Sequence, residues 1–492
     1  MSRINQNVPS MIAQRVNSHN NRMMSSTLEK LSTGYRINRG SDGPAGLIIS
    51  ENLRGELQGI NSAIGNAQRA EQVVNIAEGG LQEISNMLIE VQSLVGQTAN
   101  EAGMSPEERD ANQLQIDNIL STIDRIANSV SFQGTKLLNG NYDYTLSGQY
   151  TAASGFGDVT VNSVKISDNV GAYRQVTVTV NQSAQTARAG LLLSGGVLEN
   201  GGSGAVTFEV AGERGAQQFS FASGTTAANI VTAINAFSEA LGVSAQTSGT
   251  DVRINSIGFG TDAFVRVREI ANANTSTNFI TNTIAGATQE VRTIGRNAQV
   301  NINGVVATAR GLTARVALDG FDVAVSLLGN NGVNAAGQSR TFYVTGGGAD
   351  FNLAPDVSLA SKVSLGIETV TSTNLGNGVS GFLSELKSGG SANVQNGNLT
   401  KAQEILDLAT KQISSLRGRL GAFTKNIVGS TINSLGVAFE NTTAAESAIR
   451  DTDFAAETAQ MTRNQILVQA STQALAMANS APQAVLQLMR GG

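Results

Sequence analysis

The side chains that most often perform chemistry are scarce in this chain of 492 residues. It contains no Cys and a single His, His19. The absence of Cys excludes thiol catalysis and disulfide bonds. One imidazole is too few for the zinc and iron sites that His and Cys ligands build. Sites for hard cations made only of carboxylates remain open on composition alone. The residue types therefore argue against an enzyme, and we expect no cofactor.

Three local patterns resemble functional motifs but are better explained by structure. Asp451 and Asp453 are close enough for paired-carboxylate chemistry. An apolar helical run follows them, so we interpret them as helix caps. The Gly-Phe-Gly stretch at 258–260 lacks the third glycine and the following helix of a dinucleotide-binding loop. His19 lies on an apolar helical stripe and is interpreted as a packed residue. No catalytic, metal-binding or cofactor-binding residue is predicted.

Charge and hydropathy exclude two further classes of function. The formal net charge is -5 and only 14% of residues are charged, with no basic groove of the kind that binds nucleic acid. No stretch is long and apolar enough to predict insertion into a membrane. Residues 1–7 are polar and lack the apolar run of a signal peptide. Taken alone, these features predict a cytoplasmic protein.

Apolar stripes at helical spacing occur at both ends of the chain. Residues 3–39 are expected to form one amphipathic helix and residues from 453 onward another. A helix with one apolar face needs a partner in water, so we expect the two stripes to pack on each other. The stripe residues are Val8, Ile12, Val16, Met23 and Leu31 at the front, and Phe454, Met461, Val468, Leu475, Val485 and Leu488 at the back.

Between the two ends, three segments predict a coiled-coil bundle. Residues 44–100 alternate apolar steps of three and four, as a coiled-coil seam does. A capping box at Ser105 and another at Thr400 begin two further helices, and Asn139-Gly140 indicates a β-hairpin. The predicted core of the bundle contains Ile60, Ile64, Val74, Leu81, Ile84, Leu88, Val91, Val95, Ile116, Ile123, Leu416, Leu420 and Phe423.

The middle of the chain has a different texture, with short alternating runs rich in Gly, Thr and Val. Such runs are typical of β-strands. The predicted fold is a mainly α coiled-coil and helical-bundle core formed by both chain ends, with an inserted β-rich (α+β) outer region. We expect an inner domain of 1–40 plus 451–492 and a bundle domain of 41–150 plus 399–450. The insertion, 151–398, is divided into subdomains at about 151–290 and 291–350 and a return segment.

Short motifs at both ends resemble those of bacterial flagellin. At the front, Leu-Ser-Thr-Gly-Tyr-Arg-Ile-Asn stands at 31–38. At the back, Arg-Gly-Arg-Leu-Gly-Ala-Phe stands at 417–423, Met-Thr-Arg-Asn-Gln-Ile-Leu at 461–467 and Ala-Pro-Gln-Ala-Val-Leu at 481–486. Residues 204–267 also resemble a small insertion module found in many flagellins. The motifs are specific because they occur together, in order, at opposite ends of the chain.

The resemblance implies a structural subunit of the bacterial flagellar filament, used for swimming. It implies terminal helices that form an inner tube, a coiled-coil shell around them and a surface-exposed insertion. It implies secretion through the flagellum's own channel without a cleaved signal peptide, which replaces the cytoplasmic interpretation. The implied partners are further copies of the chain, a flagellar export chaperone, and hook-junction and cap proteins.

The resemblance also bears on immune recognition. Flagellins recognised by the animal innate-immune receptor carry Arg, Leu and Glu at the positions of Glu90, Leu94 and Gln115, and only Leu94 agrees here. A reversed charge in a contact surface weakens binding, so we expect weak or absent recognition.

Two alternatives stand beside the filament subunit. One is a hook–filament junction protein, which shares the terminal helices. The other is an enzyme displayed on the filament, and it fails because its H-E-x-x-H motif needs two histidines.

Overall fold

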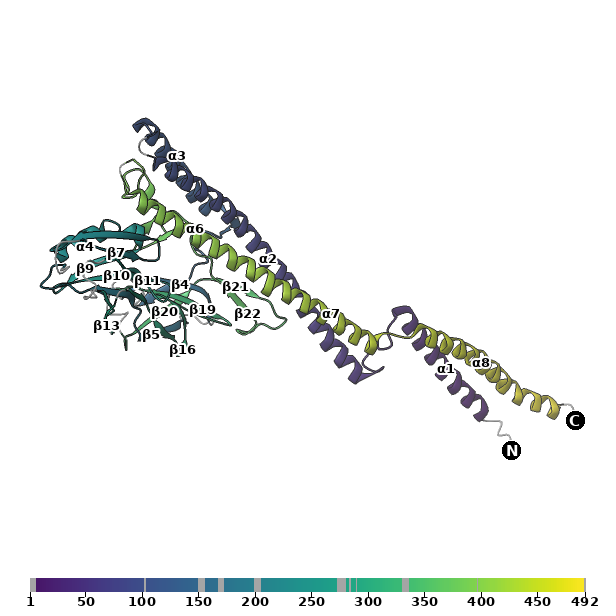
Figure 1. Cartoon of the computed structure of the whole chain (residues 1–492). Helices are drawn as coiled ribbons and strands as arrows, with labels where there is room; N and C mark the ends of the chain where they lie inside the picture. Colours follow the sequence, from purple (N-terminus) through teal and green to yellow (C-terminus); the bar gives the residue numbers. More distant parts are fainter. Residues whose placement is uncertain are drawn as a thin grey trace. The chain divides into compact units, whose positions relative to one another are not determined.

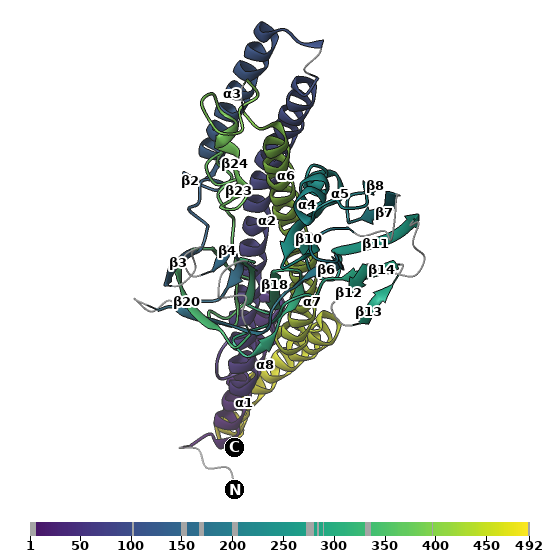
Figure 2. The same ribbon diagram turned by 60° about the vertical axis from the view of Figure 1, so that its left-hand side comes forward.

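A computed structural model describes residues 6–100, 103–148, 155–166, 172–198, 205–271, 280–282, 285–288, 290–329, 336–395 and 397–490. The chain divides into two compact units. The terminal unit consists of Met1–Arg69, Asn352–Val357 and Asn426–Gly492. The central unit consists of Ala70–Phe351 and Ser358–Lys425. Figures 1 and 2 show their helices and strands, and each unit is described by itself.

The terminal unit contains helix α1 (Val8–Thr33), the first part of α2 (Pro44–Thr98), α7 (Gly429–Arg450) and α8 (Phe454–Arg490). The side chain of Asn7 caps the start of α1 by accepting a hydrogen bond from the Ser10 N–H. Gly34 ends α1 with a φ of 77°, a conformation that glycine adopts without strain. The sequence therefore sets both ends of α1 locally.

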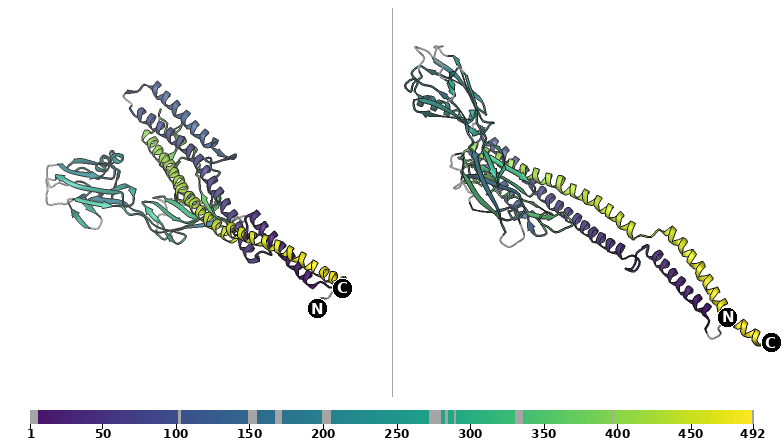
Figure 3. Two further views of the ribbon diagram at one scale, coloured as in Figure 1. Left: turned by 90° about the vertical axis from the view of Figure 1, so that its right-hand side faces the viewer. Right: turned by 90° about the horizontal axis from the view of Figure 1, so that it is seen from below.

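A short backbone joint connects the two terminal helices. Tyr35 and Asp451 form an antiparallel bridge, and Thr452 N–H donates to Gly34 C=O at 2.9 Å. The Asp453 carboxylate accepts hydrogen bonds from Ala455 N–H and Ala456 N–H at 2.9 and 3.2 Å. Asp453 is therefore a helix cap, as the sequence indicated. From this joint α1 and α8 lie side by side and antiparallel (Figure 3).

The bundle in the central unit is formed by the later part of α2, α3 (Pro106–Ser129) and α6 (Leu399–Ala422). The predicted capping box at Ser105 is present in full, with Ser105 and Glu108 each accepting the other's backbone N–H. The second predicted box is wrong by two residues. Asn398 caps α6 by accepting from Lys401 N–H, because an amide side chain caps as well as a hydroxyl does.

A π-helical turn, Phe423–Val428, follows α6 and shifts the apolar seam by one residue. Ile427, which continues the three-four spacing of the sequence, is exposed, whereas Val428 is buried. A π turn contains one more residue than an α turn, so the next seam position moves one residue along the chain. Sequence periodicity alone cannot detect this shift.

The β-hairpin of the bundle lies earlier than predicted. Strand β1 (Ser131–Phe132) pairs with β2 (Thr135–Lys136) through a turn at Gln133 and Gly134. Both turn residues have positive φ, 48° and 84°, which the tight hairpin turn requires. The Asn139-Gly140 signal is therefore not the hairpin turn.

The β-rich region of the central unit consists of two modules, one nested in the other. The outer module has the sheets β16-β15-β5-β20-β3 and β17-β18-β19-β4, and the inner module has β13-β12-β6-β10-β9 and β14-β11-β7-β8. Each pair of sheets encloses its own apolar core. Helix α4 (Ala227–Asn235) adds Ile230 and Ile234 to the core of the inner module.

The strands of the outer module are β3 (Thr145–Gly148), β4 (Phe156–Val164), β5 (Arg174–Gln182), β15 (Gln299–Ile302), β16 (Val305–Val306), β17 (Thr308–Arg310), β18 (Thr313–Leu318), β19 (Phe321–Leu327) and β20 (Ser339–Gly346). Those of the inner module are β6 (Thr186–Leu191), β7 (Ala205–Ala211), β8 (Ala216–Ala222), β9 (Val243–Ser248), β10 (Asp251–Phe259), β11 (Phe264–Ala271), β12 (Ile280–Asn282), β13 (Ala285–Thr288) and β14 (Glu290–Ile294). The short helix α5 (Ser238–Leu241) precedes β9. The return to the bundle contains the pairs β21 (Ala349–Asn352) with β22 (Lys362–Leu365) and β23 (Gly376–Asn377) with β24 (Gly381–Phe382).

The nesting corrects the predicted boundary between the two subdomains. In the outer module, Val180 of β5 pairs with Val300 of β15, more than 100 residues along the chain. The subdomains are therefore not consecutive at about residue 290. Strand alternation identifies strands but not their partners, because pairing between distant strands leaves no local signal.

Candidate assembly surface

The face on which α1 meets α8 has fully buried polar residues among half-buried apolar ones. Thr27, Asn464 and Ser471 are buried there, with 3%, 3% and 6% of their surface exposed. Asn464 Nδ2 donates to Thr27 Oγ1 at 3.0 Å, and Ser471 Oγ donates to Asn17 Oδ1 at 3.1 Å. Asn20 Nδ2 donates to the Leu467 carbonyl at 3.2 Å. Directional hydrogen bonds, rather than close apolar packing alone, hold this pair together.

The predicted apolar stripe of α1 lies mostly off this face, which corrects the sequence interpretation. Val8, Ile12, Val16 and Met23 are exposed by 51%, 49%, 44% and 43%, and only Leu31 is half-buried. Residues on the contact face of α1 follow a separate three-four series that contains Asn17, Asn20 and Thr27. A helix with two such series can bury either, and the hydrogen bonds of the polar series favour it within a single chain.

On α8 the predicted residues divide between the two faces. Met461, Val468 and Leu475 are half-buried next to the polar pairs, whereas Phe454 is exposed. The side chains of Val485 and Leu488 lie outside the described residues. Further apolar side chains point outward from the two helices, namely those of Met11, Leu28, Ile466, Leu467 and Met477. In the single chain, the terminal pair therefore presents apolar side chains on both helices without a partner.

The buried polar residues were missed by the sequence analysis. A signal was available, because Asn464 and Ser471 are seven residues apart, at the spacing of a coiled-coil seam. Polar residues at seam spacing look like solvent-facing residues when only apolar positions are counted.

Most residues of the predicted coiled-coil core are buried. All have at most 7% of their surface exposed except Ile64, which is half-buried while its neighbour Ala63 is buried. Two side-chain contacts tie α6 to α2 beside this core. Arg417 forms an ion pair with Glu78 at 2.9 Å, and Gln92 Nε2 donates to Asp407 Oδ1 at 3.3 Å. The bundle is thus a packed scaffold rather than a site for chemistry.

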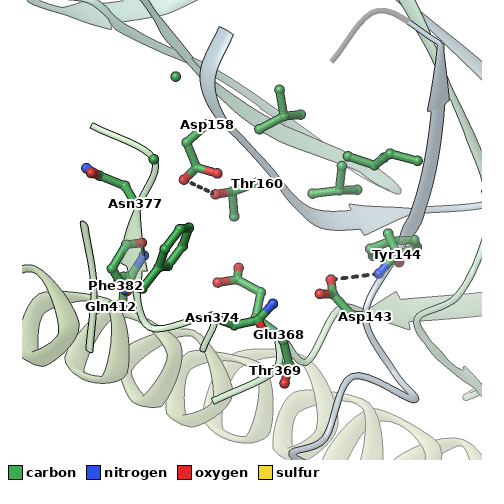
Figure 4. A pocket seen from close by; sticks show the side chains of 16 residues that line it. Asp143, Tyr144, Asp158, Thr160, Glu368, Thr369, Asn374, Asn377, Phe382 and Gln412 are labelled. Atoms are coloured by element: carbon green, nitrogen blue, oxygen red, sulfur yellow. Dashed lines mark hydrogen bonds between the residues drawn. The ribbon is translucent and has the colours of Figure 1, made fainter. Parts of the chain in front are cut away.

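A second feature, an acidic pocket, lies in the central unit. Asp143, Asp158 and Glu368 line a cavity of about 400 Å³ together with Gln412 of α6, and Figure 4 shows the three carboxylates around this space. Glu368 Oε1 accepts a hydrogen bond from Arg419 Nη2 at 3.1 Å.

Burial shifts the pKa of each of the three carboxylates in the acidic pocket. It raises the pKa of Asp143 and that of Asp158. It also raises the pKa of Glu368, where the opposing effect of the Arg419 guanidinium is smaller and the two aspartates add to the rise. The three carboxylates are therefore held at an electrostatic cost near neutral pH.

Two structural features, a cluster of metal ligands and a membrane-spanning helix, are absent from the part of the chain that the structure describes. There, no three or more His, Cys, Asp or Glu side chains are placed to hold a metal ion. Among the same residues, no helix combines the length and the apolar character needed to cross a bilayer.

The positions that bear on immune recognition are all on bundle helices. Glu90 of α2 and Gln115 of α3 are exposed, whereas Leu94 is buried in the chain itself. The prediction of weak or absent receptor recognition stays untested by these positions.

Comparison with known families matches both helical ends of the chain. The bacterial flagellin N-terminal helical region matches residues 4–143, and the bacterial flagellin C-terminal helical region matches residues 403–489. These segments contain α1, α2, α3, nearly all of α6, and α7 and α8. The nested β-rich modules lie between them.

Relatives among known proteins cover the whole chain. It is 30% identical to the B-type flagellin of Pseudomonas aeruginosa, with 99% of each chain covered. It is 29% identical to flagellin B of Helicobacter pylori and 28% identical to a flagellin of Salmonella rubislaw, again with 99% of each chain covered.

Two solved structures have weaker similarity. The flagellar hook associated protein-3 of Legionella pneumophila is 12% identical with a TM-score of 0.26, covering 81% of this chain and 96% of that one. Two domains of the flagellar cap protein of Escherichia coli are 14% identical with a TM-score of 0.28, covering 41% of this chain and 98% of that one. We base no argument on similarities this low.

Proposed function

The chain belongs to the bacterial flagellin family and is a structural subunit of the flagellar filament, and from this premise we propose that its copies polymerise through the outward apolar faces of α1 and α8. The proposal rests on one observation. Val8, Ile12 and Val16 of α1, with Ile466 and Leu467 of α8, are exposed on a helix pair whose fully buried contacts are polar.

Burial of these side chains in a polymer supplies the driving force. Fully burying a Val, Leu, Ile or Met side chain stabilises by about 1.5–3 kcal/mol. A pair of helices with exposed apolar side chains gains this stabilisation only when other copies cover them. Filament assembly and ordering of the terminal pair are then one event, because neighbouring subunits supply the missing contacts.

The domain division follows from the same premise. We propose that 1–40 plus 451–492 form the inner, assembling part and that 41–150 plus 399–450 form the bundle around it. The region 151–398 is proposed to face outward, since its two modules enclose cores of their own. A module that buries its own apolar residues has no need of neighbouring subunits to fold.

Export and partners form a finer part of the proposal. The filament is extracellular, and we propose that the chain reaches it unfolded, through the flagellum's own channel and without a cleaved signal. An export chaperone would cover the apolar faces of α1 and α8 before export, and hook-junction and cap proteins would contact the filament ends. The measured mass of the subunit in purified filaments tests the first point, because removal of a signal would leave fewer than 492 residues.

The alternative of a hook–filament junction protein is less well supported. The relatives at 28–30% identity, with 99% of each chain covered, carry flagellin names. The family is one of structural proteins, which agrees with the absence of an enzymatic motif in the sequence.

Truncation tests the assembly proposal. A chain that ends at residue 452 lacks α8, so it is expected to stay soluble under conditions in which the full chain forms filaments visible by electron microscopy. The unfolding transition of the central unit should be unchanged, because α8 belongs to the other unit. Normal filaments from the truncated chain would contradict the proposal.

A further inference from the structure

Polar contacts follow the α1–α8 pair along most of its length. Asn7 Nδ2 donates to the Ala478 carbonyl at 2.9 Å, near the free end of α1. The Ser471–Asn17 and Asn464–Thr27 hydrogen bonds follow towards the joint. Hydrogen bonds at three positions along the pair therefore fit one alignment of α8 on α1.

The buried hydroxyl of Thr27 and the buried amide of Asn464 are paired with each other. Thr27 Oγ1 accepts from Asn464 Nδ2 and donates to the Met23 carbonyl at 3.0 Å. If α8 slid along α1 by one turn, the Asn464 amide would face Met24 or Leu31 instead of a hydroxyl. A buried amide without a hydrogen-bond partner is strongly unfavourable.

Apolar contacts in the same pair cannot perform this selection. Met461, Val468 and Leu475 of α8 are half-buried in the pair, and their packing does not require a particular partner atom on α1. Dispersion and hydrophobic contacts are not directional, and single polar residues are known to select register in coiled coils at a cost in stability.

We propose that the buried pairs Asn464–Thr27 and Ser471–Asn17 are specificity-determining contacts that, together with the joint at Tyr35 and Asp451, set the register of α8 on α1. The register decides which exposed residues of the two helices stand together, and therefore the shape of the apolar surface offered to the next copy. This inference rests on the proposed function for its consequence in the filament, but the register itself is measurable independently.

The absence of Cys makes a disulfide test possible. Ser10 Oγ donates to Asn479 Oδ1 at 2.5 Å, so the double variant S10C/N479C reports the native register. S10C/A476C reports a slip of one turn, which would bring the Asn464 amide opposite Met24. Each reporter is added as a minor fraction to wild-type subunits growing on filament seeds and is oxidised with copper phenanthroline. Intramolecular cross-linking is then read from gel mobility.

In the wild-type background we expect at least tenfold more cross-linking of S10C/N479C than of S10C/A476C. In a background carrying T27V, N464L, N17L and S471A, we expect this ratio to fall to within about threefold of unity, or the chain to be excluded from filaments that accept the control. The control is T458V/T462V, whose exposed hydroxyls donate to Phe454 and Thr458 carbonyls of their own helix.

The exchanged variant T27N/N464T separates hydrogen bonding from packing. It places the amide on α1 and the hydroxyl on α8, so the hydrogen-bonded pair is restored. This variant should enter filaments and keep the wild-type ratio of cross-linking between the two reporters. Retention of the full ratio by the apolar variant overturns the inference. So does loss of the ratio in the exchanged variant to the same degree as in the apolar one. If the proposed function is wrong, the result is different from these two outcomes. Wild-type subunits would then not extend the seeds through their terminal helices.

Discussion

Replacing the exposed apolar face of α1 gives the most direct measure of its contribution to assembly. The variant V8S/I12S/V16S removes three apolar side chains that the single chain leaves about half exposed. None is at one of the buried polar contacts that hold α1 to α8. Within one chain the substitutions should therefore change little, while contacts between copies are weakened.

The magnitude follows from the surface that remains to be buried. Each side chain still exposes about half of its surface, so covering it in a filament is expected to stabilise by about 1 kcal/mol, half the value for a whole side chain. Three substitutions then cost about 3 kcal/mol per subunit, which corresponds to roughly a 100-fold higher critical concentration because each 1.4 kcal/mol is tenfold.

The assay is the concentration of subunit that stays in the supernatant after ultracentrifugation of seeded filaments at equilibrium. A matched variant, V305S/V306S/L318S, removes three exposed apolar side chains from the outer β module and is expected to change this concentration by less than about threefold. Circular dichroism of both variants verifies that the bundle is intact. If V8S/I12S/V16S polymerises at the wild-type concentration, the outward face of α1 is not an assembly surface.

Three further predictions follow from the bundle, the acidic pocket and the receptor positions. Leu88 is fully buried and Ile89 is 57% exposed, so L88A should lower the free energy of unfolding by about 2–5 kcal/mol and I89A by less than about 1 kcal/mol, as measured by urea denaturation of the full chain. Burial raises the pKa of Asp143 and that of Asp158. A carboxyl group whose pKa is higher in the folded state lowers the free energy of unfolding when it is ionised. The lost stability returns as the pH falls from the raised pKa to the ordinary pKa of the group. The urea midpoint of D143N/D158N should therefore exceed that of the wild type at pH 7, with the gap closing towards about pH 4, and a gap that widens on acidification would refute this sign. Purified monomer should activate the innate-immune receptor weakly or not at all, E90R should increase activation measurably in a reporter-cell assay, and strong activation by the wild type would contradict the expectation.

Local patterns in the sequence were sufficient for the elements that local physics controls. The capping box at Ser105 and the cap at Asp453 depend on residues within one helical turn. The seam of α2 from Val74 to Val95 is buried as its three-four spacing predicted. Turns such as Asn303-Gly304 depend on the left-handed φ that Asn and Gly tolerate. The motifs at both ends were enough to identify the family.

The remaining features depend on groups that are far apart in the sequence. The nesting of the β modules depends on the pairing of β5 with β15, and the acidic pocket depends on the return segment bringing Glu368 towards Asp143. Neither arrangement has a local signature.

The sequence by itself determined that both ends of this protein form helices with apolar stripes and that the bundle has a coiled-coil seam, because periodicity is a property of neighbouring residues. Only the tertiary structure decided that α1 meets α8 through Thr27, Asn464 and Ser471 and leaves Val8 and Ile12 outward. The reason is that a helix carries more than one face, and the groups on the opposite helix select which face is buried.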